Sequence, residues 1–227
     1  MSYIIAIDGP AGSGKGTVAS YLAEKLGFLN VDTGAMYRCV TLAVLNNQIN
    51  LNDTEKIIEV AKKVKIDLKD VNGTIATYLN GEDVSAEIRT PKVNAAISVV
   101  SAIKEVREIM VEHQRNLAKE NNIVMEGGDI GTTVFPNANI KIYLDATPEE
   151  RAGRRYRQNL ENGLNVPYEE VLESIKKRDR IDSSREISPL RIPENATIVD
   201  TNGWDGETAC KNIYKLVKDL MEENKWK

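Results

Sequence analysis

Residues Gly9 to Thr17 carry the strongest chemical signal in the sequence. They match the phosphate-binding pattern GxxxxGK in full. Glycines let backbone N–H groups converge on phosphate oxygens, the start of a following helix adds positive potential, and Lys15 adds a point charge. The structural alternative is a glycine-rich turn with a solvated lysine. We expect an ATP-binding loop made of Gly9, Pro10, Ala11, Gly12, Ser13, Gly14, Lys15, Gly16 and Thr17.

The loop departs from the strict pattern at one position that bears on magnesium. Gly16 stands where a Ser or Thr usually ligates the ion, and Thr17 follows one residue later. Mg²⁺ commonly keeps several waters and binds through substrate phosphates. A water-mediated shell is therefore expected, with Asp32 and Thr17 as the candidate protein groups. Asp32 is equally an N-cap candidate for the next helix, and both interpretations stay open.

Arginine is unevenly distributed. Eight of the 12 arginines lie between Arg151 and Arg191, but only two of the 18 lysines do. The guanidinium group can bind phosphate or carboxylate in a bidentate way, which an ammonium group cannot. This segment is therefore expected to bind small anions.

Composition excludes several other classes of protein. The chain has 227 residues, with 30 Lys and Arg against 34 Asp and Glu, which argues against nucleic-acid or anionic-membrane binding. His113 is the one histidine, and its place on an apolar stripe at helical spacing indicates a packed or edge-of-core residue. Cys39 and Cys210 form no metal or disulfide pattern, and the N-terminal apolar run is too short for a signal or membrane segment. We expect a cytoplasmic protein that acts as a monomer.

Strands and helices alternate along most of the chain. Strands are expected at 3–7, 28–31, 122–125, 140–144 and 196–199. Helices are expected at 15–26, 35–46, 53–64 with Asp53 as N-cap, 148–159, 168–180 and 206–223, with one more helical stretch through 99–117. Residues 64–90, with turns at Asn72-Gly73 and Asn80-Gly81, indicate a small antiparallel insert. The alternation predicts an α/β fold with a mainly parallel sheet, which binds ligands at the carboxyl ends of its strands.

Several segments together resemble the bacterial cytidylate kinase family, in the right order and over essentially the whole chain. They are Asp32-Thr33-Gly34-Ala35-Met36-Tyr37-Arg38, the run 81–90, the run 129–136, and 141–146 with Glu150-Arg151-Ala152. The resemblance implies a P-loop NTPase three-layer fold with a five-stranded parallel sheet, a helical arginine-rich lid and a small antiparallel β insert. It implies a core at about 1–34, 91–147 and 192–227, an acceptor-binding region at about 35–90 and a lid at about 148–191.

The resemblance also implies a reaction, ATP with CMP or dCMP giving ADP with CDP or dCDP, and roles for the matched residues. Thr33, Tyr37 and Arg38 would line the acceptor pocket, while Ser98, Arg107 and Asp129 would read the cytosine ring. Arg178, Asp182 and Arg185 would contact the acceptor phosphate and ribose. The catalytic residues would be Lys15, Arg151, Arg155 and Arg185, although a surface ion pair is the alternative for each arginine. An arginine finger can contribute about 10³–10⁵ in rate.

This reaction needs no general base. The second pKa of a phosphate monoester is about 6, so most CMP is a dianion at neutral pH. The scarcity of histidine is therefore no obstacle to the reaction.

Gly128 is the main departure from the family pattern. The family typically has [DE]-G-R-D, where this chain has Glu126-Gly127-Gly128-Asp129. The resemblance implies that the missing arginine would help hold the acceptor phosphate, so we expect weaker CMP binding or slower turnover. Two alternatives remain: a kinase for another nucleoside monophosphate such as UMP, and a catalytically weakened nucleotide-binding module.

Overall fold

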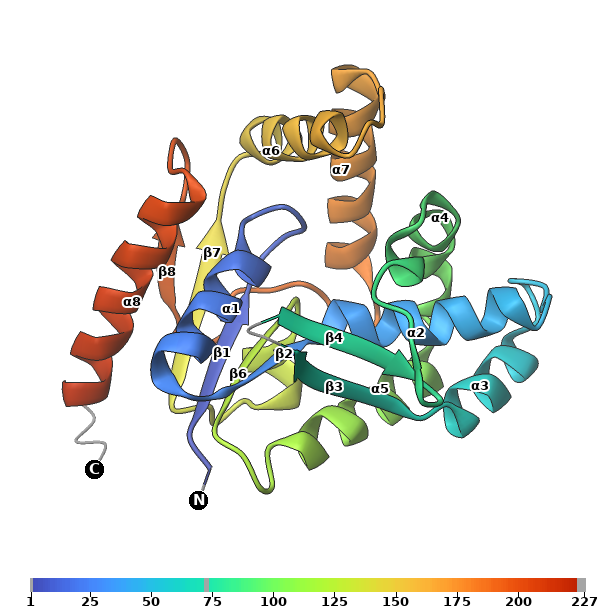
Figure 1. The fold of residues 1–227 in the computed structure, drawn as a ribbon, viewed down its shortest axis with the longest axis horizontal. Coiled ribbons are helices and arrows are strands. Elements are labelled where there is room, and N and C mark those ends of the chain that lie inside the picture. Colours follow the sequence, from blue (N-terminus) through green and yellow to red (C-terminus); the bar gives the residue numbers. More distant parts are fainter. Residues whose placement is uncertain (1, 72–73, 224–227) are drawn as a thin grey trace. The chain divides into compact units, whose positions relative to one another are not determined.

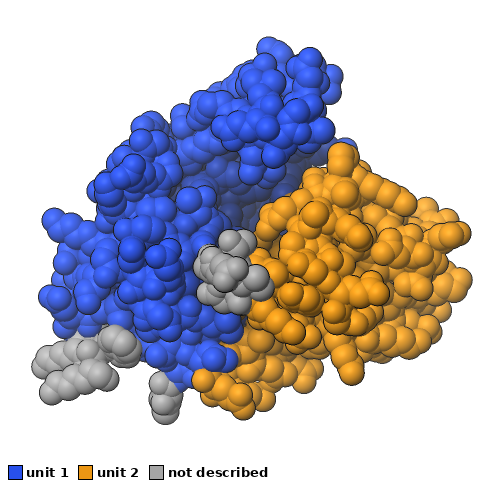
Figure 2. Space-filling view, viewed as in Figure 1, with its two compact units in different colours: residues 1–30, 121–227 blue, residues 31–120 orange. Residues whose placement is uncertain are grey.

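A computed structural model describes residues 2–71 and 74–223. The chain forms two compact units (Figures 1 and 2). The first contains residues 1–30 and 121–227, and the second contains residues 31–120.

A five-stranded sheet forms the centre of the first unit. Its order is β2-β6-β1-β7-β8 (Figure 1), with bounds β1 Ile4–Asp8, β2 Leu29–Asp32, β6 Ile123–Gly127, β7 Ile140–Asp145 and β8 Thr197–Asp200. Strand β1 pairs in parallel with β6 and β7, and β7 pairs in parallel with β8. The predicted α/β fold with a five-stranded parallel sheet is confirmed, and each strand lies within two residues of its expected bounds.

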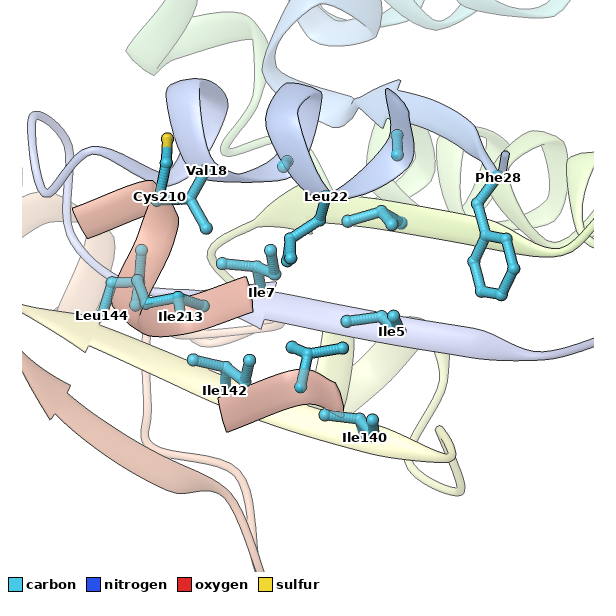
Figure 3. Close-up of a cluster of buried hydrophobic side chains, with 14 of the residues drawn as sticks. Ile5, Ile7, Val18, Leu22, Phe28, Ile140, Ile142, Leu144, Cys210 and Ile213 are labelled. Carbon is cyan, nitrogen blue, oxygen red and sulfur yellow. The ribbon is translucent and has the colours of Figure 1, made fainter. Parts of the chain in front are cut away.

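Helices α1 (Lys15–Leu26) and α8 (Gly206–Glu223) bury their apolar faces against this sheet. Figure 3 shows the cluster, in which side chains such as Ile5, Leu22 and Ile142 are fully buried. Burying apolar area contributes about 25 cal/mol per Å², so this cluster is a main stabiliser of the strand that leads into the phosphate-binding loop.

Two further helices of the first unit carry the arginine-rich segment. Helix α6 (Pro148–Glu161) begins after Thr147, whose Oγ1 accepts from the Glu150 N–H at 3.2 Å. Helix α7 (Tyr168–Ser184) packs on α6 through a small cluster around Ala152. The expected helices are confirmed, and both extend a few residues further than predicted.

The second unit contains the antiparallel insert. Helices α2 (Thr33–Asn46) and α3 (Thr54–Lys63) precede strands β3 (Ile66–Val71), β4 (Thr74–Leu79) and β5 (Glu82–Asp83), which pair as an antiparallel meander. Asp53 caps α3 by accepting from the Lys56 N–H, as predicted. Asn80 and Gly81 have positive φ in the β4–β5 turn, and the predicted Asn72-Gly73 turn lies outside the described residues.

The helical stretch predicted through 99–117 is instead two helices, α4 (Pro91–Val100) and α5 (Lys104–Leu117), which follow a short 3₁₀ turn at Glu87–Arg89. Between them, Ala102 and Ile103 donate to carbonyls three residues back, a pattern that ends an α-helix. Val99, the first residue of the predicted stretch, is 44% exposed. His113 on α5 is half-buried, as an edge-of-core residue should be.

Cys39 and Cys210 are both buried and free. Within 2–71 and 74–223, no group of three or more His, Cys, Asp or Glu side chains could hold a metal ion. In the same part of the chain, no helix has the length and apolar character to span a membrane.

Candidate nucleotide-binding site

The carboxyl ends of four strands bring the candidate site of the first unit together. Asp8 at the end of β1 is in register with Gly127 of β6 and with Tyr143 of β7, and Asp145 of β7 is in register with Asp200 of β8. The segments that follow these strands therefore share one edge of the sheet. They are the phosphate-binding loop, the segment from Gly128, the start of helix α6 and the loop from Thr201.

The phosphate-binding loop has the backbone geometry that its glycines suggest. Gly9 has φ 149°, and a Cβ there would lie 2.2 Å from the Leu144 carbonyl oxygen, so the loop can leave β1 this way only with glycine. Gly14 caps α1 in the left-handed region. The first four N–H groups of an α-helix have no partner within the helix, so the start of α1 presents donors to an anion. The Lys15 Nζ donates to the Pro10 carbonyl at 2.8 Å, which curls the side chain over the loop.

Glu126 lies beside this loop, where the sequence pattern gave it no role of its own. A Cβ on Gly16 would lie 3.4 Å from the Glu126 Oε1. A Ser or Thr side chain at position 16 would therefore approach the carboxylate of a residue at the end of β6. Thr17, which carries the hydroxyl one residue later, is exposed.

Asp8 is a buried carboxylate at the end of β1, fully shielded from solvent. Its Oδ1 accepts from the Ile130 N–H at 2.6 Å and its Oδ2 from the Gly131 N–H at 2.7 Å. Burial raises the pKa of Asp8 to about 6, the nearby Asp129 charge adds to the rise, and the two amides and Lys15 oppose it. Sequence reasoning missed Asp8, because its partners are more than a hundred residues away in the chain.

This pKa makes the contribution of Asp8 to stability depend on pH. Because the pKa rises from 3.8 to about 6 on folding, the folded state binds more protons than the unfolded state between those values. Stability due to Asp8 is therefore greatest at low pH and falls as pH rises toward 6. The free energy of unfolding of the wild type relative to Asp8→Asn should fall by up to about 3 kcal/mol between pH 4 and pH 6.5. Urea unfolding at several pH values measures this, and a relative stability that rises with pH would contradict it.

Arg151 is 3% exposed near the start of helix α6. Its Nε donates to the Ala146 carbonyl at 2.9 Å and one terminal nitrogen to the Ala11 carbonyl at 3.1 Å. The two terminal nitrogens bind the Asp179 carboxylate of α7 at 3.0 and 2.6 Å. Arg151 thus ties the phosphate-binding loop, the end of β7 and helix α7 together, a role that helical spacing alone did not reveal.

We expect the Arg151–Asp179 pair to stabilise the packing of α6 on α7. Asp179→Ala would leave a buried guanidinium without its bidentate carboxylate, which should cost about 1.5–3 kcal/mol. Lys176→Ala is the matched control, because it removes the exposed pair with Glu149 between the same two helices, a change worth about 0–1 kcal/mol. Chemical unfolding of the two variants measures the difference in their free energies of unfolding. Equal losses of stability in both variants would contradict a stabilising role for the buried Arg151–Asp179 pair.

Arg154 and Thr201 form a second connection, between helix α6 and the loop after β8. Thr201 is fully buried, and its Oγ1 donates to the Asp145 carbonyl at 3.0 Å. Arg154 donates to this hydroxyl at 3.2 Å and pairs with Glu150 at 3.3 Å. Arg155, by contrast, is exposed on α6. Neither Arg154 nor Thr201 was among the predicted site residues.

The structure brings together the three predicted residues near the end of α7. Asp182 pairs with Arg178 at 3.4 Å and also with Arg185. The Asp182 carbonyl accepts from the Leu190 N–H, and Leu190 lies 3.6 Å from where a Cβ on Gly128 would be. The position of the missing family arginine therefore borders the segment that carries Asp182 and Arg185. Asp129, the next residue, is 5% exposed.

In the second unit, several predicted acceptor-pocket residues lie on α2, α4 and α5. The Arg107 guanidinium stands over the Tyr37 ring, 5.1 Å from its centroid, and donates to the Ser101 carbonyl at 3.0 Å. Thr33 is buried at the start of α2, and Ser98 is half-buried on α4.

Arg38 and Asp32 also have defined partners in this unit. Arg38 donates to the Asn94 side chain and to the Ile88 carbonyl. Asp32 caps α2 by accepting from the Ala35 N–H at 2.9 Å, and its other oxygen faces Arg89 at 3.4 Å. The N-cap interpretation of Asp32 is confirmed, and both of its oxygens are engaged.

Comparison with known proteins agrees with this arrangement. The sequence model of the cytidylate kinase family matches residues 5–219 of this chain. A cytidylate kinase of Caldanaerobacter subterraneus subsp. tengcongensis is 52% identical over 94% of both chains. Those of Caldicellulosiruptor bescii and Caldicellulosiruptor saccharolyticus are 47% and 48% identical, over 95% and 93% of this chain and 97% and 94% of theirs. The chain belongs to the cytidylate kinase family.

Proposed function

We propose that this protein transfers the γ-phosphoryl group of ATP to CMP and dCMP, a step of pyrimidine nucleotide metabolism. The family match over residues 5–219 carries the proposal. The complete phosphate-binding loop and its geometry before α1 support it independently. As a member of this family the protein is a nucleotide-binding phosphotransferase.

Phosphoryl transfer depends mainly on positioning and on neutralising charge. In the proposed mechanism the amides of the loop and Lys15 hold the β- and γ-phosphates, while Arg155 and Arg185 neutralise the transferred group. Arg151 would join them by exchanging its Asp179 partner for phosphate. The acceptor oxygen attacks in line, without a base, because CMP is largely a dianion at neutral pH.

The proposed acceptor residues suit cytosine chemically. The ring offers an amino donor at N4 and acceptors at N3 and O2. Asp129 would accept from the amino group, and Ser98 and Arg107 would donate to the acceptors. Arg38, Arg178 and Arg185 would bind the phosphate, with Thr33, Tyr37 and Asp182 completing the pocket.

Mg²⁺ would assist by neutralising phosphate charge when bound with ATP. The residues around the loop fit an ion held mostly by phosphates and water, since Gly16 supplies no hydroxyl. Thr17 and Glu126 carry side-chain oxygens that such an ion could use, and Glu126 lies beside Gly16. Asp32 fits less well than sequence reasoning suggested, because Ala35 and Arg89 occupy its oxygens.

We further propose that the chain works as a core, an acceptor-binding region with the β insert and a lid, with the boundaries expected from its sequence. Closure of an arginine-bearing lid over ATP would exclude the water that otherwise hydrolyses it. Such a movement would bring Arg155, which is exposed on α6, to the transferred phosphoryl group.

A coupled assay of ADP formation tests the proposal with CMP, dCMP, UMP and AMP as acceptors. We expect CMP and dCMP to support the fastest ADP formation. Faster turnover with UMP would identify a kinase for another acceptor. Because Gly128 replaces an arginine of the family pattern, a weakened nucleotide-binding module is the second candidate, and ADP formation that no acceptor increases would favour it.

A further inference from the structure

We propose that Asp8 is a positioning residue, which holds the segment 129–131, and with it the cytosine-reading Asp129, in place against the phosphate-binding loop. The proposal rests on the proposed function, because it concerns recognition of the acceptor base. It assigns a role to a buried carboxylate that the reaction itself does not use.

The hydrogen bonds of Asp8 carry the argument. Both carboxylate oxygens are used, each by one N–H group of two consecutive residues, at 2.6 and 2.7 Å. These residues directly follow Asp129, and Asp8 directly precedes Gly9. One side chain thus joins the residue where the ATP loop begins to the residue after the proposed base reader. Charge-assisted hydrogen bonds are shorter and stronger than neutral ones.

The packing of Gly131 shows how closely this segment is held. A Cβ on Gly131 would lie 3.1 Å from the Asp8 Oδ2 and 2.9 Å from the Pro193 Cγ. Glycine is therefore needed for the segment to fit between the carboxylate and the proline. The segment continues as a π-helical turn, Ile130–Val134, in which the Asp129 carbonyl accepts from the Thr133 and Val134 N–H groups. Such turns are uncommon and are frequent at functional sites.

This arrangement predicts a specific defect rather than a general loss of activity. In Asp8→Asn one oxygen is replaced by an NH₂ group, which would oppose a backbone N–H at hydrogen-bond distance. The segment must then shift, and Asp129 with it, while α1 and its loop remain packed on the core. Because the pairing is charge-assisted, the KM for CMP should rise about ten-fold or more.

Three measurements on purified full-length protein test the proposal. They are the KM for CMP, the ratio of kcat/KM for CMP to that for UMP, and the Kd for ATP without acceptor. In Asp8→Asn we expect the KM for CMP to rise and the CMP-to-UMP ratio to fall. The Kd for ATP should change less than the KM for CMP, because the two carboxylate oxygens of Asp8 accept from Ile130 and Gly131. Unchanged values of the first two, or equal changes in all three, would overturn the proposal.

Met221→Ala is the control for lost stability, because Met221 is 3% exposed and lies on α8 in the hydrophobic cluster of the first unit. It should lower the melting temperature and leave both KM and base preference unchanged. If Asp8→Asn does not fold, Gly131→Ala disturbs the same contact from the other side and should give the same kinetic pattern. Gly131→Ala with normal base preference would then overturn the proposal.

The outcomes separate this proposal from the proposed function. If the wild-type protein forms no ADP in response to CMP, the proposed function fails, whatever the variants do. If the wild type prefers CMP and Asp8→Asn keeps that preference, only the positioning role of Asp8 fails.

Discussion

Replacing Lys15 with Ala is expected to lower kcat by about 10²–10³-fold, the cost of losing one preorganised electrostatic contact to the transition state. Lys15 opens α1, and its side chain lies over the loop against the Pro10 carbonyl. The charge that develops on the transferred phosphoryl group would then lack its nearest fixed cation. Steady-state ADP formation at saturating CMP and ATP measures the effect.

Lys25→Ala is the matched control for this change. Lys25 lies in the last turn of the same helix, is exposed, and pairs only loosely with Glu24 at 3.6 Å. This variant should retain the kcat of the wild type. A Lys15→Ala variant that also retains it would show that the loop amides and the arginines suffice for phosphate transfer.

Gly128→Arg is expected to raise kcat/KM for CMP by about ten- to a hundred-fold, the value of a charge-assisted phosphate contact. The backbone permits the change, because a Cβ there meets only the Leu190 Cδ1 at an ordinary 3.6 Å. Leu190 is hydrogen bonded to the Asp182 carbonyl, so the new side chain would start beside the segment that carries Arg185. Initial rates over a range of CMP concentrations measure the gain.

Gly128→Ala tests whether the added charge or the loss of backbone freedom causes the gain in kcat/KM. Alanine stiffens the loop but adds no contact to phosphate, so we expect little change in kcat/KM. If alanine raised kcat/KM as much as arginine does, rigidity would explain the gain. If neither raised it, other arginines would already cover the acceptor phosphate.

Local signals in the sequence were sufficient for most of the fold. The GxxxxGK pattern sits between β1 and α1 as expected, and the cap at Asp53 forms with the predicted residue. These features depend on neighbours within a few positions. The break between α4 and α5 was missed, because the apolar spacing runs through it and no Gly or Pro marks it.

The site was predictable only in part. The catalytic role predicted for Arg151 stays a prediction, and the structure shows its guanidinium bound to the carboxylate of Asp179. The hydrogen bonds between Asp8 and Gly131 and between Arg154 and Thr201 join segments far apart in the chain. No spacing rule reports such contacts, since they arise only when the carboxyl ends of the strands meet at one edge of the sheet.

Transfer of label from ATP to product tests the central claim most directly. The protein is incubated with CMP and ATP carrying radioactive phosphorus in its γ-phosphate, and the products are separated by chromatography. We predict that the label appears in CDP, in an amount equal to the ADP formed. Label released only as inorganic phosphate, or retained in ATP, would contradict the account.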